Sequence, residues 1–487
     1  MDEATPASLD PDDWTAFRAQ SHRMLDDMLD YVEHIRQRPV WQPIPATARS
    51  HFQQPLPRAG SSLEAAHQTF MTEVLPYAAG NVHPGFMGWV QGGGTAVGMV
   101  AEILAAGLNA NVGGRNQMPV EVERQIVRWM RELFRFPENA SGIFVTGTSM
   151  ANLMSVLVAR TVAAGTGVRA TGLHACPRQL VAYTSVAAHG CIAQAMDLSG
   201  IGGAALRRIA VNERHQIDVA ALAAAIAADR AAGLQPFFIT GTAGTVDTGA
   251  VDDLDAVAEI ARRESLWFHV DGAYGALGML APDIAPLLAG IERADSIAFD
   301  FHKWGQVQYD AGFLLVRDGA THMAAFSAPV AYLRREARGL AAGSPWPCDF
   351  GPDLSRGFRA LKTWMTITVY GADRLGQVIS ETCRLARILA ARVQAHPALE
   401  LLAPVTLNIV CFRYRGADNG ADGTPDLDAI NRDIVADLHE SGIAVPSTTT
   451  IGGRLVIRAA IVNHRTGEQD IDALLAAVVA LGAVRCL

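Results

Sequence analysis

The sequence has no apolar run long enough to cross a lipid bilayer. A membrane-spanning helix needs roughly 20 consecutive apolar residues, and the stretch TAVGMVAEILAAGL is interrupted by Glu102. The first residues, MDEATPASLDPDDW, are acidic and lack the positively charged start and apolar core of a secretory signal. We therefore expect a soluble, cytoplasmic protein that has no membrane partner.

Positive charge and paired cysteines are also scarce. The net charge of −9 disfavours nucleic acid or an anionic membrane as the main partner, so small molecules are favoured. The cysteines form no CxxC pair, and no histidine stands at metal-ligand spacing, so we predict no metal site and reduced, mostly buried thiols. The six cysteines are Cys176, Cys191, Cys348, Cys383, Cys411 and Cys486.

What is present is enough length for about three domains. We expect a helical and extended dimerisation segment over residues 1–80, a large domain over 81–355 and a small α/β domain over 356–487. Apolar residues recur at helical spacing between residues 10 and 37, with Asp10 as the expected cap, and a proline-rich stretch follows. This helix packs either on a second subunit or on its own domain, and the pattern leaves both open.

Between about residues 81 and 330, short β-rich runs alternate with helical patterns. GIFVTG precedes SMANLMSVLVART, for example, and PFFITGT precedes VDDLDAVAEIARRE. This alternation predicts βαβ units and a mostly parallel sheet flanked by helices. Ligands of such sheets bind at the carboxyl ends of the strands.

Chemically useful residues follow four of the predicted strands. Because the carboxyl ends of parallel strands lie along one edge of a sheet, we expect these residues to converge. They are Asp271 after LWFHV; Asp300, His302 and Lys303 after SIAF; His189 after LVAYTS; and Thr146, Gly147, Thr148 and Ser149 after GIFV.

Together these groups fit pyridoxal 5'-phosphate. A helix start binds a phosphate, a lysine forms a Schiff base with an aldehyde, a carboxylate keeps a pyridine nitrogen protonated, and an imidazole stacks on the ring. Each group alone has an ordinary explanation, such as a helix cap, a surface pair or a turn. Their combination favours the cofactor.

The same motifs resemble a known family. HVDGAYG at 269–275 and HKW at 302–304 are similar to segments of the pyridoxal-phosphate-dependent group II amino acid decarboxylases, which act on aromatic amino acids, histidine, glutamate and diaminobutyrate. Further matching stretches are HPGFMG at 83–88, EVERQIVRWM at 121–130, RGFRALKTWM at 356–365 and IVCFRYR at 409–415. The resemblance implies the aspartate-aminotransferase-like fold (fold type I) and a homodimer with active sites at the subunit interface.

The resemblance also implies a role for each site residue. Lys303 would be the Schiff-base lysine, and Asp271 the partner of the pyridine nitrogen. The remaining cofactor-binding residues would be His189 stacked on the ring, Ala273 beneath it, Thr242 near the cofactor, Thr148 and Ser149 at the phosphate, and His302 beside it.

Tyr332 is the expected proton donor. In the aromatic decarboxylases a tyrosine on a loop returns a proton to the α-carbon after carbon dioxide leaves, and SAPVAYLRREARG places Tyr332 at the matching position. Relatives with phenylalanine there resemble aldehyde synthases, so Tyr332 favours simple decarboxylation. An ordinary interface tyrosine is the alternative.

Some residues depart from the aromatic pattern. Asp300 stands where asparagine is usual, which makes it doubtful as a phosphate ligand, and Met150 stands where glutamate is common. Arg458 matches a family arginine to which the sequence gives no role. The expected substrate-pocket residues, part of them reaching the partner's site, are His83, Phe86, Asn109, Asn111 and Ser355.

These features lead to one main hypothesis and three alternatives. The main hypothesis is decarboxylation of an aromatic or heteroaromatic L-amino acid, such as tyrosine, dihydroxyphenylalanine or histidine. The alternatives are decarboxylation of a polar amino acid such as glutamate or 2,4-diaminobutyrate, carbon–carbon cleavage of a phosphorylated amine, and a non-catalytic binding relative.

Overall fold

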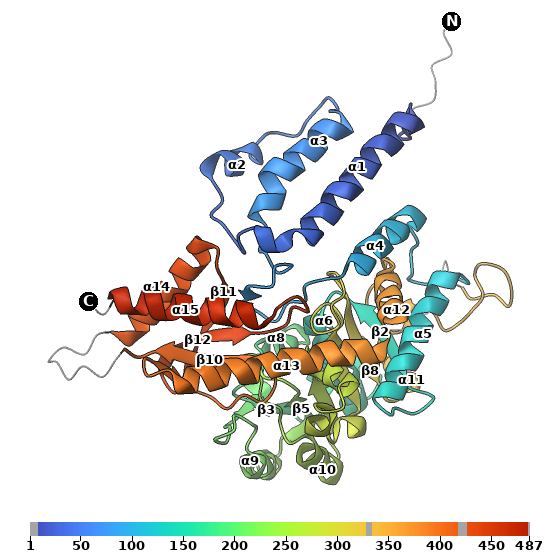
Figure 1. The fold of residues 1–487 in the computed structure, drawn as a ribbon. Coiled ribbons are helices and arrows are strands. Elements are labelled where there is room, and N and C mark those ends of the chain that lie inside the picture. Colours follow the sequence, from blue (N-terminus) through green and yellow to red (C-terminus); the bar gives the residue numbers. More distant parts are fainter. Residues whose placement is uncertain (1–7, 328–333, 417–425, 486–487) are drawn as a thin grey trace, which may run out of the picture.

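The computed structural model describes residues 8–327, 334–416 and 426–485, which form two β-sheets with helices packed around them (Figure 1). The larger sheet has seven strands in the order β2–β8–β7–β6–β5–β3–β4. Strands β7, β6, β5, β3 and β4 are parallel to one another, whereas β8 runs antiparallel to both β7 and β2. The strands are β2 (Ser141–Val145), β3 (Leu180–Ser185), β4 (Leu206–Ile209), β5 (Gln235–Thr242), β6 (Trp267–Asp271), β7 (Ser296–Asp300) and β8 (Gly312–Val316).

This arrangement confirms the expected mostly parallel sheet flanked by helices. The helices of this part of the chain are α4 (Ala96–Leu108), α5 (Met118–Leu133), α6 (Thr148–Ala164), α7 (Val168–Thr171), α8 (Cys191–Leu198), α9 (Val219–Ala231), α10 (Leu254–Glu264), α11 (Gly319–Phe326) and α12 (Arg359–Tyr370).

The two faces of the sheet are covered by different helices because strand side chains alternate. Ile143 and Val145 of β2 pack in one apolar cluster with Met154 of α6. Phe144, between them, belongs to the main core, and its backbone N–H donates to Glu123 of α5 at 3.1 Å. Helix α6 therefore covers one face of this edge and α5 covers the other.

The smaller sheet has the order β1–β11–β12–β10–β9. Strand β1 pairs in parallel with β11, so a two-residue strand at positions 86–87 joins a sheet otherwise made by the carboxyl-terminal part of the chain. The elements are β1 (Phe86–Met87), α13 (Ala372–Ala395), β9 (Leu399–Leu401), β10 (Ile409–Tyr414), α14 (Leu427–Ser441), β11 (Val445–Ile451), β12 (Arg454–Ala460) and α15 (Glu468–Arg485).

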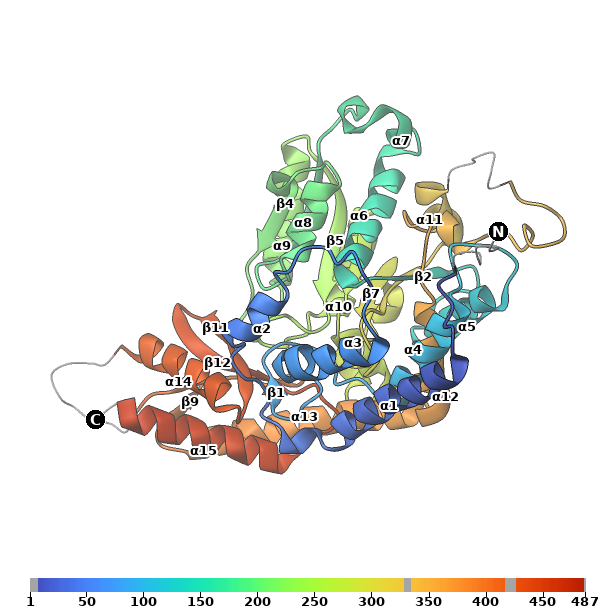
Figure 2. The same cartoon turned by 90° about the horizontal axis from the view of Figure 1, so that it is seen from above.

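Three amino-terminal helices, α1 (Trp14–Glu33), α2 (Ala46–His51) and α3 (Leu63–Thr69), project from the two sheets in Figure 1, and Figure 2 shows them from above, in front of the rest of the chain. The predicted helix begins later than expected, because Asp13 rather than Asp10 caps it. The Asp13 carboxylate accepts the backbone N–H groups of Thr15 and Ala16 at 2.8 and 3.0 Å. Trp14 and Phe17 on this helix remain exposed in the single chain.

Across the described ranges, no helix combines the length and the apolar character that crossing a bilayer requires.

Candidate active site

The carboxyl ends of β5, β6 and β7, the turn after β3 and the start of α6 surround a cavity of about 390 Å³. All the residues that were predicted to bind the cofactor line it, so the strand ends converge as expected. These residues are Thr148, Ser149, His189, Thr242, Asp271, Ala273, His302 and Lys303.

Lys303 is held at the cavity by Asp300. Its ammonium Nζ lies 2.8 Å from Oδ2 of Asp300. The other carboxylate oxygen, Oδ1, accepts the backbone N–H of Thr148 at 2.7 Å. Buried Asp300 thus links the lysine to the amino-terminal end of α6, where the helix dipole favours negative charge.

His302 faces the same carboxylate. Its Nε2 lies 3.5 Å from Oδ2 of Asp300, and its Nδ1 accepts the backbone N–H of Ala311 at 2.9 Å. Burial lowers the pKa of His302, while Asp300 opposes that fall. Because Nδ1 is an acceptor, the neutral ring carries its proton on Nε2, as a donor toward the cavity.

Asp271 is a second buried carboxylate at the cavity. Oδ1 accepts the backbone N–H of Ala273 at 3.1 Å, and Oδ2 accepts an N–H of Asn152 at 3.1 Å. Burial raises the pKa of Asp271, and the positive charge of Lys303 opposes that rise. The Asp271 carboxylate can therefore accept a further hydrogen bond from a donor in the cavity.

His189 and Cys191 approach the cavity from the turn before α8. Nδ1 of His189 accepts the backbone N–H of Cys191 at 3.1 Å, which leaves Nε2 as the donor of the neutral ring. The Cys191 thiol lies 3.9 Å from Oδ2 of Asp271. Burial, followed by the Asp271 charge, raises the pKa of Cys191 to about 12, so this thiol stays protonated and is a poor nucleophile.

The residues fit pyridoxal phosphate. The hydroxyl oxygens of Thr148 and Thr242 are buried and have no hydrogen-bond partner within the described chain. An unsatisfied buried hydroxyl costs about 1–3 kcal/mol, so these atoms favour a ligand rich in acceptors. The start of α6 suits a phosphate, Lys303 offers an amine for an aldehyde, and Asp271 offers a carboxylate for a ring nitrogen.

The residues that were predicted for the substrate pocket do not line this cavity within the single chain. His83 is buried, and its Nδ1 accepts the backbone N–H of Gly85 at 2.9 Å. Phe86 pairs with Val445 in the smaller sheet. Both residues therefore have packing positions, and Trp89, two residues after the end of β1, lines the cavity.

The other predicted pocket residues lie on the surface. Asn109 ends α4 in the left-handed conformation, with φ of 47°. Oδ1 of exposed Asn111 accepts the backbone N–H of Arg356 at 3.0 Å, next to exposed Ser355. Their expected approach to a partner's site stays a prediction. Tyr332 lies outside the described residues.

Two residues at this site had no role assigned from the sequence: Asn152, which contacts Asp271 from outside the cavity lining, and Arg458, which lines the cavity. Asn152 is one turn beyond Thr148 on α6, a spacing that places both on one helix face and could have indicated it. Arg458 on β12 donates to the backbone oxygens of Val246 and Gly88 at 2.9 and 2.7 Å. No carboxylate lies within ion-pairing distance of Arg458 in the part of the chain that the structure describes.

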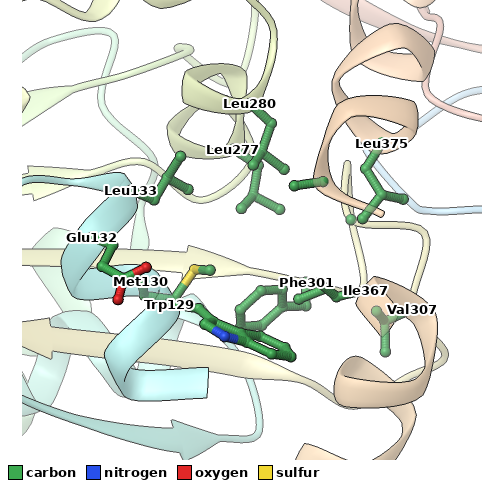
Figure 3. Close-up of a pocket in the computed structure, with 12 residues that line it drawn as sticks. Trp129, Met130, Glu132, Leu133, Leu277, Leu280, Phe301, Val307, Ile367 and Leu375 are labelled. Atoms are coloured by element: carbon green, nitrogen blue, oxygen red, sulfur yellow. The ribbon is translucent and has the colours of Figure 1, made fainter. Parts of the chain in front are cut away.

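A second cavity, of about 310 Å³, lies on the other side of the segment that carries Lys303. His302 and Lys303 face the first cavity, whereas Phe301, Gly305 and Val307 face the second. Figure 3 shows its mostly apolar lining, drawn from α5, the 277–280 turn, α12 and α13. The charged side chain in this lining is the acidic Glu132, at the margin. Within the described residues, the cavity therefore offers a phosphate no positively charged donor.

Comparisons with known proteins match most of the chain. The family model described as the pyridoxal-dependent decarboxylase conserved domain matches residues 45–415. The aromatic-L-amino-acid decarboxylase of Bacillus atrophaeus is 30% identical over 469 residues, which cover 95% of each chain.

Solved structures show the same fold. A structure of Oryza sativa TDC with PLP and tryptamine matches with a TM-score of 0.88 at 25% identity, covering 98% of this chain and 100% of that chain. The glutamate decarboxylase domain of diaminobutyrate-pyruvate transaminase and L-2,4-diaminobutyrate decarboxylase from Vibrio parahaemolyticus matches with a TM-score of 0.85 at 26% identity, covering 98% and 97%.

These matches confirm the expected fold type I architecture, the expected cofactor and the expected class of enzyme, a carboxy-lyase. The family match spans the seven-stranded sheet and includes every residue of the cavity except Arg458. The chain therefore belongs to the pyridoxal-dependent decarboxylases.

Proposed function

We propose that this protein decarboxylates an aromatic or heteroaromatic L-amino acid to the amine and carbon dioxide. The observation that carries this proposal is the lining of the cavity beside Lys303, where Trp89, Val90, Val246 and Tyr309 offer aromatic and apolar surface. Aromatic side chains bury large apolar areas and pack well against such surfaces. The whole-length similarity to an aromatic-L-amino-acid decarboxylase supports the same substrate class.

Each cofactor contact has a proposed residue. Lys303 would attach the aldehyde carbon, Asp271 would accept a hydrogen bond from the ring nitrogen, and His189 and Ala273 would contact the ring. Thr148, Ser149 and His302 hold the phosphate, and Thr242 lies near the cofactor. When bound, pyridoxal phosphate supplies a protonated ring that accepts the electron pair left as carbon dioxide departs.

The chain's own side chains then hold or transfer the protons of the reaction. The carboxylate of Asp271 keeps the ring nitrogen protonated, because a buried negative charge stabilises a positive partner. Asp300 forms an ion pair with the Lys303 ammonium whenever the lysine is not attached to the cofactor. The 2.8 Å distance between Nζ of Lys303 and Oδ2 of Asp300 supports this role. Tyr332 returns a proton to the α-carbon.

Arg458 favours a second candidate, decarboxylation of an amino acid with an acidic side chain such as glutamate. Its buried guanidinium lines the cavity and pairs with no described carboxylate, so it suits an anionic group of the substrate. Exposed Asn109 and Asn111 add amides that suit a polar side chain if they reach the partner's site.

Carbon dioxide release across the common L-amino acids distinguishes the candidates. We expect turnover of tyrosine-like, dihydroxyphenylalanine-like or histidine substrates. Turnover of acidic amino acids alone would reject the aromatic proposal. In that case Arg458→Gln should raise KM about 100-fold, whereas Arg454→Gln, an exposed arginine on the same strand, should leave it unchanged.

We also propose a homodimer. Ile103, Leu104 and Leu108 on α4, together with Trp14 on α1, are each more than half exposed, which is unusual for large apolar side chains clustered on helices. A second copy of the chain would cover them. The cytoplasmic location stays a prediction.

A further inference from the structure

We propose that Asn152 and His269 are positioning residues that hold Asp271 as an ionised acceptor for the ring nitrogen of the cofactor. This rests on the proposed function, in which Asp271 is the partner of that nitrogen. Neither residue lines the cavity, so we expect both to affect the cofactor only by way of Asp271.

A continuous chain of buried hydrogen bonds leads to Asp271. Nδ2 of Asn152 lies 3.1 Å from Oδ2 of Asp271, and Oδ1 of Asn152 lies 2.7 Å from Nε2 of His269. On the far side of the imidazole, Nδ1 lies 2.8 Å from Oγ of Ser296 and 3.0 Å from Oγ of Ser155.

The chemistry of the groups fixes the direction of every bond. An ionised carboxylate only accepts, so the amide N–H of Asn152 must donate to Asp271. The amide oxygen must then accept from Nε2–H of His269, which leaves Nδ1 to accept from a serine hydroxyl. Burial lowers the pKa of His269 to about 3, so the ring stays neutral and keeps this one tautomer.

These hydrogen bonds counteract the rise that burial causes in the pKa of Asp271. Burial favours the protonated form of a carboxyl group, whereas hydrogen bonds donated to its oxygens favour the ionised form. Asn152 and the Cys191 thiol donate to Oδ2, whereas Oδ1 accepts the backbone N–H of Ala273, so Oδ1 keeps a lone pair for the cofactor. The titratable groups that face Asp271 are Lys303 from the turn after β7, and His189 and Cys191 from the start of α8.

Helix α6 gives the arrangement its geometry. Thr148 in its first turn faces the proposed phosphate site, and Asn152 one turn later holds the carboxylate at the ring nitrogen. One rigid helix therefore sets the spacing between the groups proposed for the two ends of the cofactor.

The test measures the dissociation constant of pyridoxal phosphate for the apoprotein at pH 6 to 9. Asn152→Leu keeps the side-chain size but removes both hydrogen bonds, and it should weaken binding about 10- to 100-fold, the effect of losing one hydrogen bond to a charged group. The loss should grow as pH falls, because Asp271 then protonates more readily. Asn431→Leu, which removes a buried amide from α14 in the smaller domain, is the matched control and should bind normally.

His269 provides an independent pair of variants if Asn152→Leu does not fold. In His269→Gln an amide N–H can replace Nε2–H, so affinity should stay within about threefold, whereas His269→Phe should lose about tenfold. Wild-type affinity and wild-type pH dependence in both Asn152→Leu and His269→Phe would overturn the positioning role. Asp271→Asn separates the two proposals, because normal cofactor binding in that variant would reject the role of Asp271 itself.

Discussion

At the scale of single residues, Asp300 shows how one departure from a family pattern changes a site. Its carboxylate joins Lys303 to the backbone N–H of Thr148, and the usual asparagine could keep the second contact but not the ion pair. Asp300 also places a negative charge beside the groups proposed to hold the cofactor phosphate. Its task therefore concerns the lysine rather than the phosphate.

Asp300→Asn should bind pyridoxal phosphate about tenfold more tightly, because it removes a charge of the same sign as the phosphate. The apoprotein should melt at a lower temperature, because the Lys303 ammonium loses its partner. Cofactor titration and thermal unfolding with and without cofactor measure both effects. Weaker cofactor binding in this variant would show that the carboxylate contributes to the phosphate site.

Tyr332→Phe tests the proposed proton donor. Loss of a positioned general acid typically slows proton transfer about 10²- to 10⁴-fold, so amine output should fall by at least about 100-fold while aldehyde and ammonia rise. The two products and oxygen consumption are measured together. An unchanged ratio of amine to aldehyde would remove Tyr332 from the mechanism.

At the scale of elements, the segment from Gln91 to Gly94 packs against the turn that carries Lys303. The backbone N–H of Gly92 donates to the carbonyl oxygen of His302 at 3.0 Å. A Cβ at Gly92 would lie 2.5 Å from the carbonyl oxygen of Lys303 and 2.6 Å from that of His302. Glycine is required at position 92 for this close approach.

Gly92→Ala should destabilise the protein by about 1–3 kcal/mol and displace the Lys303 turn, because a backbone atom cannot move aside as a side chain can. Denaturant unfolding and cofactor affinity measure the two effects. Gly203→Ala, just before β4, is the matched control, since nothing lies within 4 Å of its added Cβ. That change should leave the free energy of unfolding within about 0.5 kcal/mol of the wild type. Equal stability of the two variants would contradict this account.

The loop between β5 and α10 predicts a pH effect on stability. Asp252 accepts the backbone N–H groups of Ile217 and Thr242 at 2.6 and 2.8 Å, and burial raises its pKa from 3.8 to about 6. The folded state then holds the proton more tightly than the unfolded state. Its contribution to stability is complete below pH 4 and is lost as pH rises through about 6.

Denaturant unfolding of the wild type and of Asp252→Asn between pH 4 and 7 tests this effect. The stability advantage of the wild type over the variant should shrink as pH rises. An advantage that grows over that range would mean that the carboxylate is more stable ionised.

The helices and strands also show which parts of the site could be predicted from the sequence. Strand ends such as Asp271 and Lys303 were predictable because alternating apolar runs mark the strands and a parallel sheet brings their ends together. Asn152 was not, because its partners Asp271 and His269 are 119 and 117 residues away in the chain. The start of α1 was misplaced because three aspartates near Pro11, at positions 10, 12 and 13, offer equivalent local caps.

At the scale of the whole molecule, the exposed apolar helices α1 and α4 carry the dimer proposal. Ile103→Glu would place a charge in the covered face, and burying an unpaired charge costs several kcal/mol. The dimer dissociation constant should therefore rise roughly 100-fold or more, with loss of activity at low protein concentration, because the active sites are proposed to lie at the interface. Sedimentation at several concentrations measures the change.

Val484→Glu is the control for this prediction. Val484 is 70% exposed on α15, in the smaller domain, so its replacement adds the same charge to another apolar surface position. It should leave the dimer intact. A dimer that survives Ile103→Glu would place the subunit contact elsewhere.

The apolar cavity behind the Lys303 turn gives the molecule an uneven response to hydrostatic pressure. Space that side chains leave unfilled is eliminated when a protein opens, so compression favours opening where that space lies. Lys303, the proposed attachment point of the cofactor, lies on the segment that separates that cavity from the proposed cofactor cavity. As pressure rises, the visible absorbance of the bound cofactor should therefore change at a lower pressure than the one at which the smaller sheet unfolds.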